Sequence, residues 1–484
     1  MRRIMIFCIP AFGHHNPTLP VAAELVRRGN AVRYYSFAPF REKILETGAE
    51  FVPCDAFLPE LTEEETGKLR KVSTTEMTVT DLKTTARMDA FLAEEVRNFC
   101  PDVIFTDSVC FWGKLTARKY KIPVVVSTTT FAFNRFSSQY MKNSFAEIAD
   151  VLGGSGRVRR ELKKLEQYGY HEKSIMPLVQ NDNFTDTVVY ATKAYQPCSH
   201  TFSKHYAFVG PSIDCNAEIR KEHARPLVYI SMGTVINERP LFYGNCIKAL
   251  EKEAVDVVIS CGQSVAPASL GSLPSNVQVF RSVDQPEVLS RANVFLTHCG
   301  MNSVSESLYM AAPMVLFPQT NEQRAVARRA RELGTGTELK DDSPEAIRKA
   351  ILEVLQNPAY RDAAEKCSRD FREAPGAAGA ADFILSAPHE MPEEDKRVMR
   401  REFLPGVIQL LYWCAAVPLI LFLGKRFGMW WLFAILANVL FAPFRKLTEK
   451  VGGMGADREN ENLMHDAKRP WLSLWESCHG ERRD

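Results

Sequence analysis

Short apolar runs alternate with amphipathic stretches through the first two hundred residues of the chain. The run at 4–9 is uncharged, as in strands that are covered on both faces of a parallel sheet. Apolar positions at helical spacing follow from Pro17, and a proline suits the first turn of a helix. This alternation predicts a doubly wound α/β domain. The further expected elements are strands at 31–36, 50–53 and 101–107, helices at 40–47, 86–99 and 151–175, and a long polar loop at 58–85.

A second set of short apolar strands begins after a charged stretch at 216–225 and repeats the pattern of the first set. The first of these strands ends in a small turn around Gly233 and Thr234, which we expect to lead directly into a helix. A chain of 484 residues is long enough for two such domains, which we place at 1–212 and 213–388. The expected strands of the second domain are 227–231, 255–260, 277–280, 294–296 and 314–317.

The most informative stretch runs from 295 to 323. A strand gives way to a turn from His298 to Gly300, and an apolar pattern at helical spacing follows Ser303. Glycine permits a turn in which the backbone passes close to another group, and a helix that opens at Ser303 presents free N–H groups and a positive dipole end. These features are typical of a phosphate site. The alternative for Ser303 and Glu306 is a capping box, which would only tie down their own helix.

Further polar side chains are expected at the same edge of the second sheet. His298 stands where one strand ends, and the strand at 314–317 leads to Glu322 and Gln323. Open α/β sheets bind their ligands at the carboxyl ends of the strands. A lone histidine at a strand end is more often structural than functional. The hypothesis of a ligand site therefore depends on several polar residues and a helix N-terminus occurring at the same sheet edge. Together these residues indicate a site for a phosphorylated ligand that is rich in hydroxyl groups.

Two titratable residues follow strands of the first domain. His14 lies just after the first strand, and Asp107 ends the strand at 101–107. If these strands are neighbours, the carboxylate can fix the tautomer of the imidazole and stabilise its charged form, which supports base catalysis worth roughly 10²- to 10⁴-fold. The structural alternative is that His14 or His15 completes a turn and that Asp107 caps the following helix.

Charge and cysteine content narrow the class of protein. The net charge of +2 argues against nucleic-acid binding. The 12 cysteines include no C-x-x-C pair, which favours reduced thiols in a cytosolic compartment. The apolar start is too short for a secretory signal, so we predict a strand there. No Asp-x-Asp motif is present, and we expect neither a metal ion nor a cofactor.

The stretch at 295–323, with its H-C-G-M-N-S turn, resembles the nucleotide-sugar signature of family 1 glycosyltransferases, particularly the bacterial macrolide glycosyltransferase group. The resemblance covers about residues 1–388 and implies two facing, doubly wound Rossmann-like domains, the glycosyltransferase-B arrangement. It also implies that His14 is the general base and Asp107 its orienting acid, because both match family motifs. The implied donor contacts are Gly233, Thr234, His298, Gly300, Asn302 and Ser303 for the diphosphate, Gln285 for the nucleobase, Glu306 for the ribose, and Glu322 with Gln323 for the sugar.

The segment that would hold the nucleobase departs from the family pattern. Ser282 and Asp284 stand where tryptophan and proline are common, while Gln285 remains to hydrogen-bond the base. The ring on which the base would stack is therefore missing. Uridine is implied by the resemblance, and thymidine or another nucleotide stays open.

An aromatic-rich segment at 127–145 follows the strand after Asp107. Aromatic residues at this density are more often part of a core than of a pocket. Because the segment emerges beside the predicted catalytic edge, we expect Phe131 and Phe133 to line an apolar acceptor pocket.

The end of the chain departs most from the family pattern. Residues 403–424 and 427–444 carry no charge, and at about 1.5 Å per residue they would span roughly 33 and 27 Å, against a hydrocarbon core of about 30 Å. Flanking basic residues favour both ends on the cytoplasmic side. We predict a basic linker at 389–402, a transmembrane helical hairpin at 403–444 and a disordered cytoplasmic tail at 445–484. An interfacial pair of helices is the alternative.

These inferences predict a UDP-glycosyltransferase at the cell membrane with its catalytic domains on the cytoplasmic side. Its partners would be a nucleotide-sugar donor, which is a co-substrate, a hydrophobic acceptor with a hydroxyl group, and the bilayer. The acceptor would be a macrolide, polyketide, sterol or phenol, and direct displacement would invert the anomeric centre of a hexose. The alternatives are a transferase acting on diacylglycerol or another lipid, a sugar-nucleotide 2-epimerase, and an inactive binding module.

Overall fold

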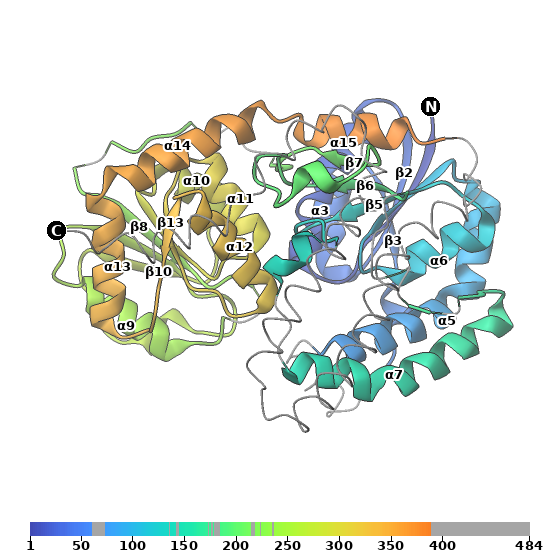
Figure 1. Cartoon of the computed structure of the whole chain (residues 1–484), viewed down its shortest axis with the longest axis horizontal. Helices are drawn as coiled ribbons and strands as arrows, with labels where there is room; N and C mark the ends of the chain where they lie inside the picture. The colour runs from blue at the N-terminus through green and yellow to red at the C-terminus, as the bar shows by residue number, and fades with distance from the viewer. Residues whose placement is uncertain are drawn as a thin grey trace, which may run out of the picture. The chain divides into compact units, whose positions relative to one another are not determined.

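The computed structural model of the chain describes residues 1–60, 73–134, 136–141, 145–172, 174–175, 178, 184–213, 218–222, 224–234 and 237–388. Two parallel β-sheets, each flanked by helices, make up these residues (Figure 1). Both sheets belong to one compact unit of the chain. The predicted pair of doubly wound α/β domains is confirmed.

The first sheet has seven parallel strands. They are β1 (Arg3–Phe7), β2 (Ala31–Ser36), β3 (Glu50–Pro53), β4 (Val103–Asp107), β5 (Val124–Thr128), β6 (Asp186–Val189) and β7 (Tyr206–Phe208), with helices α1 (Phe12–His15), α2 (Thr18–Arg27), α3 (Arg41–Glu46), α5 (Thr74–Phe99), α6 (Phe111–Tyr120) and α7 (Phe145–Leu165). Their order is β3-β2-β1-β4-β5-β6-β7, so the winding direction reverses between β1 and β4. These two strands pair in parallel, with Ile4 opposite Val103. Their carboxyl ends form the ligand-binding edge of the first domain.

The second sheet repeats this arrangement with six parallel strands. The strands are β8 (Leu227–Ser231), β9 (Asp256–Ser260), β10 (Val277–Phe280), β11 (Val294–Thr297), β12 (Met314–Leu316) and β13 (Gly336–Glu338), with helices α9 (Pro240–Leu250), α10 (Gln285–Arg291), α11 (Met301–Tyr309), α12 (Asn321–Glu332), α13 (Pro344–Gln356), α14 (Pro358–Glu373) and α15 (Gly376–Leu385). Their order, β10-β9-β8-β11-β12-β13, places the reversal between β8 and β11. The turns around Gly233 and His298 follow these two strands and so meet at one edge.

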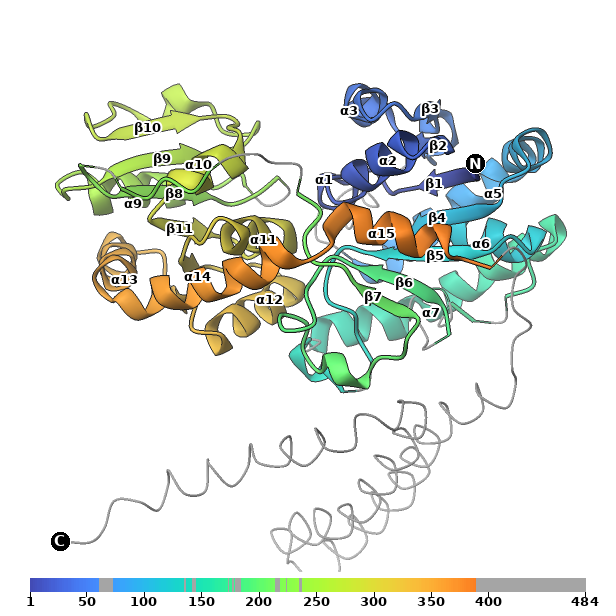
Figure 2. The same cartoon turned by 90° about the horizontal axis from the view of Figure 1, so that it is seen from above.

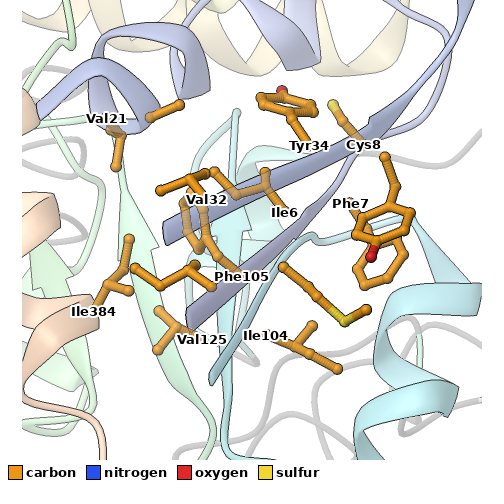
Figure 3. Packing of buried hydrophobic residues seen from close by; sticks show 14 of the residues in the cluster. Ile6, Phe7, Cys8, Val21, Val32, Tyr34, Ile104, Phe105, Val125 and Ile384 are labelled. Atoms are coloured by element: carbon orange, nitrogen blue, oxygen red, sulfur yellow. The ribbon is translucent and has the colours of Figure 1, made fainter. Parts of the chain in front are cut away.

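The core of the first domain lies between its sheet and the helices that cover it. Figure 3 shows Ile6, Val32 and Phe105 of the sheet packed with Val21 of α2. Each is at least 95% buried, and burial of such a side chain stabilises the fold by about 1.5–3 kcal/mol. This rigid packing fixes the strand ends from which the polar site residues project.

The last described helix packs against the first domain, although its sequence was assigned to the second. Helix α15 lies alongside α2 (Figure 2), and its Ile384 is fully buried in the first core (Figure 3). The guanidinium of Arg28 forms an ion pair with Asp382 and donates a hydrogen bond to the carbonyl of Ala378. The chain therefore returns to the first domain after it completes the second.

The polar stretch at 58–85 was predicted to be a loop, and this is wrong for its second half, because α5 begins at Thr74. The helix is capped by Ser73, whose Oγ accepts from the backbone N–H of Glu76 at 3.2 Å. The Asp150 carboxylate binds both Ser73 Oγ, at 2.9 Å, and the backbone N–H of Thr75, at 3.0 Å. Threonines on a helix can satisfy their hydroxyls on its own carbonyls, so a polar composition does not exclude a packed helix.

The predicted linker, membrane hairpin and tail all fall on residues 389–484, which lie outside the described residues. None of the helices in the part of the chain that the structure describes is both long enough and apolar enough to cross a bilayer.

Candidate active site

His14 and Asp107 meet at the edge where β1 and β4 end. Nδ1 of His14 lies 2.7 Å from Oδ2 of Asp107, and the other carboxylate oxygen accepts from the backbone N–H of Val109 at 2.9 Å. With both oxygens bonded, the carboxylate is held in one orientation. Because an ionised carboxylate only accepts, the shared proton belongs to Nδ1, and Nε2 carries the free lone pair. Asp107 does not cap α6, whose N-terminal cap is Cys110.

The surroundings of the pair favour a charged imidazole. The Asp107 side chain is fully buried, whereas 27% of the His14 side chain is exposed. Burial lowers the pKa of His14, but the charge of Asp107 and its hydrogen bond raise it by more, with a smaller contribution from Glu322, so the pKa lies above its usual value. A raised pKa means that the His14 imidazole is stabilised in its protonated form after it accepts a proton.

Thr129 is a third contact of His14 that sequence reasoning missed. Its Oγ1 lies 3.2 Å from His14 Nδ1, on the residue after β5. A run of threonines at 128–130 was the available signal, but it became informative only once β5 was placed beside β4.

His15 has a structural role. Its Nδ1 contacts the carbonyl of Ala11 at 3.0 Å, its Nε2 contacts Ser36 Oγ at 2.6 Å, and its ring stacks on Phe40 at 3.7 Å. Burial lowers the pKa of His15 to about 4. With both nitrogens paired, His15 is not available for proton transfer.

A close approach around His298 explains the two glycines at the edge of the second sheet. A Cβ at Gly233 or at Gly300 would lie 2.5 Å from the His298 ring, and Gly233 also has a φ of +76°. Burial lowers the pKa of His298 to about 4, so the imidazole is neutral. Its Nδ1 is buried without a hydrogen-bond partner in the part of the chain that the structure describes. A neutral ring held in this way can offer one N–H to a ligand.

A helix N-terminus of the kind that binds phosphate is present, but the helix begins earlier than predicted. Helix α11 starts at Met301, and its N-terminal cap is Gly300, whose extended backbone provides no side-chain cap. Ser303 therefore lies inside the first turn and does not open the helix. The alternative of a capping box between Ser303 and Glu306 is wrong, because their side chains both bond to Gln285.

Gln285 links the residues predicted to bind the nucleoside. Its Nε2 donates to Glu306 Oε2 at 2.7 Å and to Ser303 Oγ at 3.3 Å, and its Oε1 accepts from the Tyr229 hydroxyl at 3.1 Å. Burial raises the pKa of Glu306 to about 7, while the Gln285 bond opposes the shift. Asp284, which stands where the family has proline, caps α10 by accepting from the N–H of Glu287.

The two residues at the start of α12 differ in their surroundings. The Gln323 side chain accepts from the backbone N–H groups of Gln319 and Thr320, at 2.7 and 3.1 Å, and completes a capping box with Thr320. Its carbonyl oxygen is therefore engaged within the protein. Glu322 is exposed, and its negative charge contributes to the raised pKa of His14.

Asn302 and Thr234 come shortly after the two glycines that approach the His298 ring. The Asn302 amide donates to the carbonyl of Gly13 at 2.9 Å and so touches the catalytic loop. Thr234 is exposed. The turn around Gly233 was predicted to lead directly into a helix. This prediction is wrong, because α9 begins only at Pro240.

The acceptor-pocket prediction is wrong for Phe131. Its ring is 1% exposed and packs on Tyr195 at 5.2 Å, and Tyr195 in turn packs on Phe371 at 5.4 Å. Phe133 is half-buried and meets Phe131 edge to face at 6.5 Å. The aromatic density of this segment serves the core, and only Phe133 keeps a partly open side.

The described residues contain no cluster of three His, Cys, Asp or Glu side chains that could hold a metal ion. The neutral His298 ring, the α11 N-terminus and the nearby hydroxyls instead form a donor set suited to phosphate oxygens.

Fold and site together define the class of two-domain, Rossmann-like enzymes that bind a nucleotide at one sheet edge. The profile described as "Erythromycin biosynthesis protein CIII-like, C-terminal domain" matches residues 247–384. The NDP-glycosyltransferase YjiC of Bacillus licheniformis is 32% identical over 400 residues, which cover 79% of this chain and 97% of the relative. The demethyllactenocin mycarosyltransferase of Streptomyces fradiae is 30% identical over 409 residues, covering 79% of this chain and 86% of the relative.

A solved structure supports the same class. The calicheamicin glycosyltransferase CalG4 matches with a TM-score of 0.65 and 27% identity, covering 80% of this chain and 98% of that one. The chain belongs to the macrolide-type NDP-glycosyltransferases, which are family 1 enzymes that transfer a sugar from a nucleotide donor to a small-molecule acceptor. The lipid-acceptor and epimerase alternatives are not favoured by these relatives.

Proposed function

We propose that this glycosyltransferase inverts the anomeric centre of its donor sugar and that His14 is the general base. The observation that carries the proposal is the contact between His14 Nδ1 and Asp107 Oδ2 at 2.7 Å, which leaves Nε2 as the proton acceptor. The acceptor hydroxyl gives its proton to Nε2 as its oxygen attacks the anomeric carbon. The bond from that carbon to the diphosphate oxygen breaks, and the nucleoside diphosphate leaves with the electron pair.

The second domain would stabilise the leaving diphosphate. The free N–H groups of α11, the neutral His298 and the Thr234 hydroxyl are donors suited to phosphate oxygens. Glu306 and Gln285 would hold the nucleoside, and Glu322, close to His14, would hold a sugar hydroxyl near the base. Gln323 would contribute through its amide nitrogen, because its oxygen is engaged in the helix cap.

The donor would be a UDP-hexose, and the acceptor a hydrophobic compound with a hydroxyl group. The resemblance to family 1 enzymes supports uridine, and the Streptomyces fradiae relative, a demethyllactenocin mycarosyltransferase, supports a complex small molecule as acceptor. No metal ion is required in this scheme, because neutral donors and a helix dipole face the leaving group.

The direct test incubates the enzyme with a panel of UDP- and TDP-sugars and hydrophobic hydroxyl acceptors, and then determines the anomeric configuration of the product by NMR. The proposal predicts release of the nucleotide only with an acceptor, and a product of opposite anomeric configuration to the donor. A product with retained configuration would contradict direct displacement. Interconversion of the donor sugar without an acceptor would support an epimerase.

We further propose that residues 403–444 form a helical hairpin that holds the enzyme at the cytoplasmic face of the cell membrane. The support is the length of the two uncharged runs, 403–424 and 427–444, and the basic residues that flank them. Resistance of the full chain to extraction from membranes at alkaline pH is the expected result. Complete release under these conditions would contradict a spanning hairpin and leave an interfacial or soluble tail.

A further inference from the structure

We propose that the outer face of α7, with the adjoining part of α5, is a docking surface for an anionic lipid bilayer. Helix α7 packs along α5 (Figure 1) through Val158 and Leu162, which are buried. Gly154 permits this close packing, because a Cβ there would lie 2.1 Å from the Thr75 side chain. One side of α7 is thus fixed against the protein, and the opposite side faces solvent.

The solvent side of α7 carries a cationic stripe. Arg159 and Lys163 are four residues apart, so they share one side of the helix, and Arg160 lies next to them. All three side chains are exposed, and none has an ion-pair partner among the described residues. Two neighbouring basic residues, by contrast, have ion-pair partners. Arg157 pairs with Glu76 at 2.9 Å, and Lys164 pairs with Glu161 at 2.9 Å.

One large aliphatic side chain extends the stripe toward the N-terminus of α7. Leu152 is 70% exposed and lies seven residues before Arg159, so it is on the same side of the helix. Val151, which is 46% exposed, lies seven residues before the buried Val158 and therefore belongs to the packed side. A single exposed aliphatic residue is ordinary, but Leu152 in line with unpaired cations gives this side the mixed composition of a helix that lies in a membrane interface.

A hollow beside the stripe adds a place for a charged headgroup. It measures about 230 Å³ and lies between α5 and α7. Three cations and one acid line it together with apolar groups, namely Lys83, Arg87, Lys164 and Glu161 with Leu82 and Tyr168 among the rest. A lipid phosphate would meet a net positive lining there.

A bilayer fits this surface better than another polyanion. The cations alone would suit a nucleic acid, but a nucleic acid gains nothing from exposed Leu152, and the whole chain has a net charge of only +2. An anionic bilayer uses both the charges and Leu152. If the proposed hairpin at 403–444 inserts, it would keep α7 near lipid and strengthen a weak docking contact. The docking does not depend on the transferase activity.

The test measures cosedimentation of the full chain with vesicles of phosphatidylcholine alone and of phosphatidylcholine with phosphatidylglycerol, at low and high salt. We expect tighter binding to the anionic vesicles. The triple variant Arg159→Gln, Arg160→Gln, Lys163→Gln should reduce the ratio of anionic to neutral partitioning by about a hundredfold, because each basic residue near an anionic surface contributes about fivefold. The matched control is Lys340→Gln, Lys349→Gln, Lys366→Gln, which removes three exposed charges from the second domain and should leave the ratio unchanged.

Leu152→Ser tests the apolar part and should weaken anionic binding severalfold at high salt, where charges are screened. Circular dichroism and thermal melting check that every variant folds. Equal partitioning of the wild type to both vesicle types, or equal losses in the two triple variants, would overturn the proposal. Tight binding of soluble polyglutamate that anionic vesicles fail to displace would also overturn the proposal. Such a result would indicate that the outer face of α7 binds an acidic protein. Binding to neutral vesicles depends on the proposed hairpin at 403–444 and not on the cationic stripe. A failure of the hairpin prediction would therefore be seen separately from a failure of the docking proposal.

Discussion

His14 and Asp107 are 93 positions apart in the chain, yet His14 Nδ1 and Asp107 Oδ2 lie 2.7 Å apart. The parallel pairing of β1 with β4 produces this contact, because it brings the ends of both strands to the point where the sheet reverses its winding. The same geometry in the second sheet brings the turns around Gly233 and His298 together. The same strand order, used in both sheets, thus produces both groupings of strand-end residues.

The pH profile of the enzyme should reflect the raised pKa of His14. A general base works in its neutral form, so kcat/KM for the acceptor should fall as pH drops through that pKa. Asp107→Asn removes the charge that raises the pKa, and the acid limb should therefore move to lower pH. The maximal rate should also fall, by about 10²- to 10⁴-fold. Initial rates over about pH 5 to 9 for both forms provide the measurement. An acid limb that stays in place in the variant would show that another group titrates.

Gly300→Ala should weaken donor binding. The new Cβ would lie 2.5 Å from the His298 ring and displace it from the diphosphate site, although alanine tolerates the backbone φ of −62°. We expect the Kd of the nucleoside diphosphate to rise about tenfold, which corresponds to about 1.4 kcal/mol of binding free energy. Isothermal titration measures this change. The control is Gly244→Ala, where a Cβ meets nothing within 4 Å and where binding should be unchanged. Equal Kd values for both variants would remove His298 from the donor site.

Gln285→Ala should also weaken nucleotide binding, for a different reason. It removes the bond that orients the Glu306 carboxylate and leaves the Tyr229 hydroxyl without its partner. The loss of about 1.5 kcal/mol corresponds to roughly a tenfold higher Kd. Tyr229→Phe deletes the bond to the Gln285 oxygen but leaves the Gln285 bond to Glu306 in place, and it should cost about threefold. A variant at Gln285 that binds UDP as tightly as the wild type would show that this network is only structural.

Phe131 and Phe133 should respond differently to truncation. Phe131→Ala opens a cavity in the aromatic core and should lower the free energy of unfolding by about 3–5 kcal/mol. Phe133→Ala removes a half-buried ring and should cost about 1 kcal/mol, with a higher KM for the acceptor as its main effect. Denaturant unfolding and acceptor kinetics distinguish the two. An unchanged acceptor KM in the Phe133 variant would place the pocket elsewhere.

The strands were predictable because buried parallel strands appear in sequence as short continuous apolar runs. The runs at 31–36, 50–53 and 227–231 match the observed strands at both ends. The N-terminal half of α5 was not predictable in this way, since its polar composition is satisfied by local and long-range hydrogen bonds that only the folded chain creates.

The site was predicted where a motif and a strand end coincide. His14, Asp107 and His298 occupy such positions, and the structure places each at the end of the expected strand. The start of α11 was missed because Gly300 caps it through backbone conformation rather than through a side chain. Thr129 and Tyr229 were missed because their roles depend on which strands are neighbours. Phe131 was wrongly assigned because aromatic density alone does not distinguish a core from a pocket.

The most direct test of the central claim is acceptor-dependent release of nucleotide by the wild type and by His14→Ala, with donor binding measured in parallel. The mechanism predicts a fall in rate of about two or more orders of magnitude in the variant, with little change in the Kd of the donor nucleotide. A variant that retains the acceptor-dependent rate of the wild type would show that His14 is not the base and would contradict the mechanism.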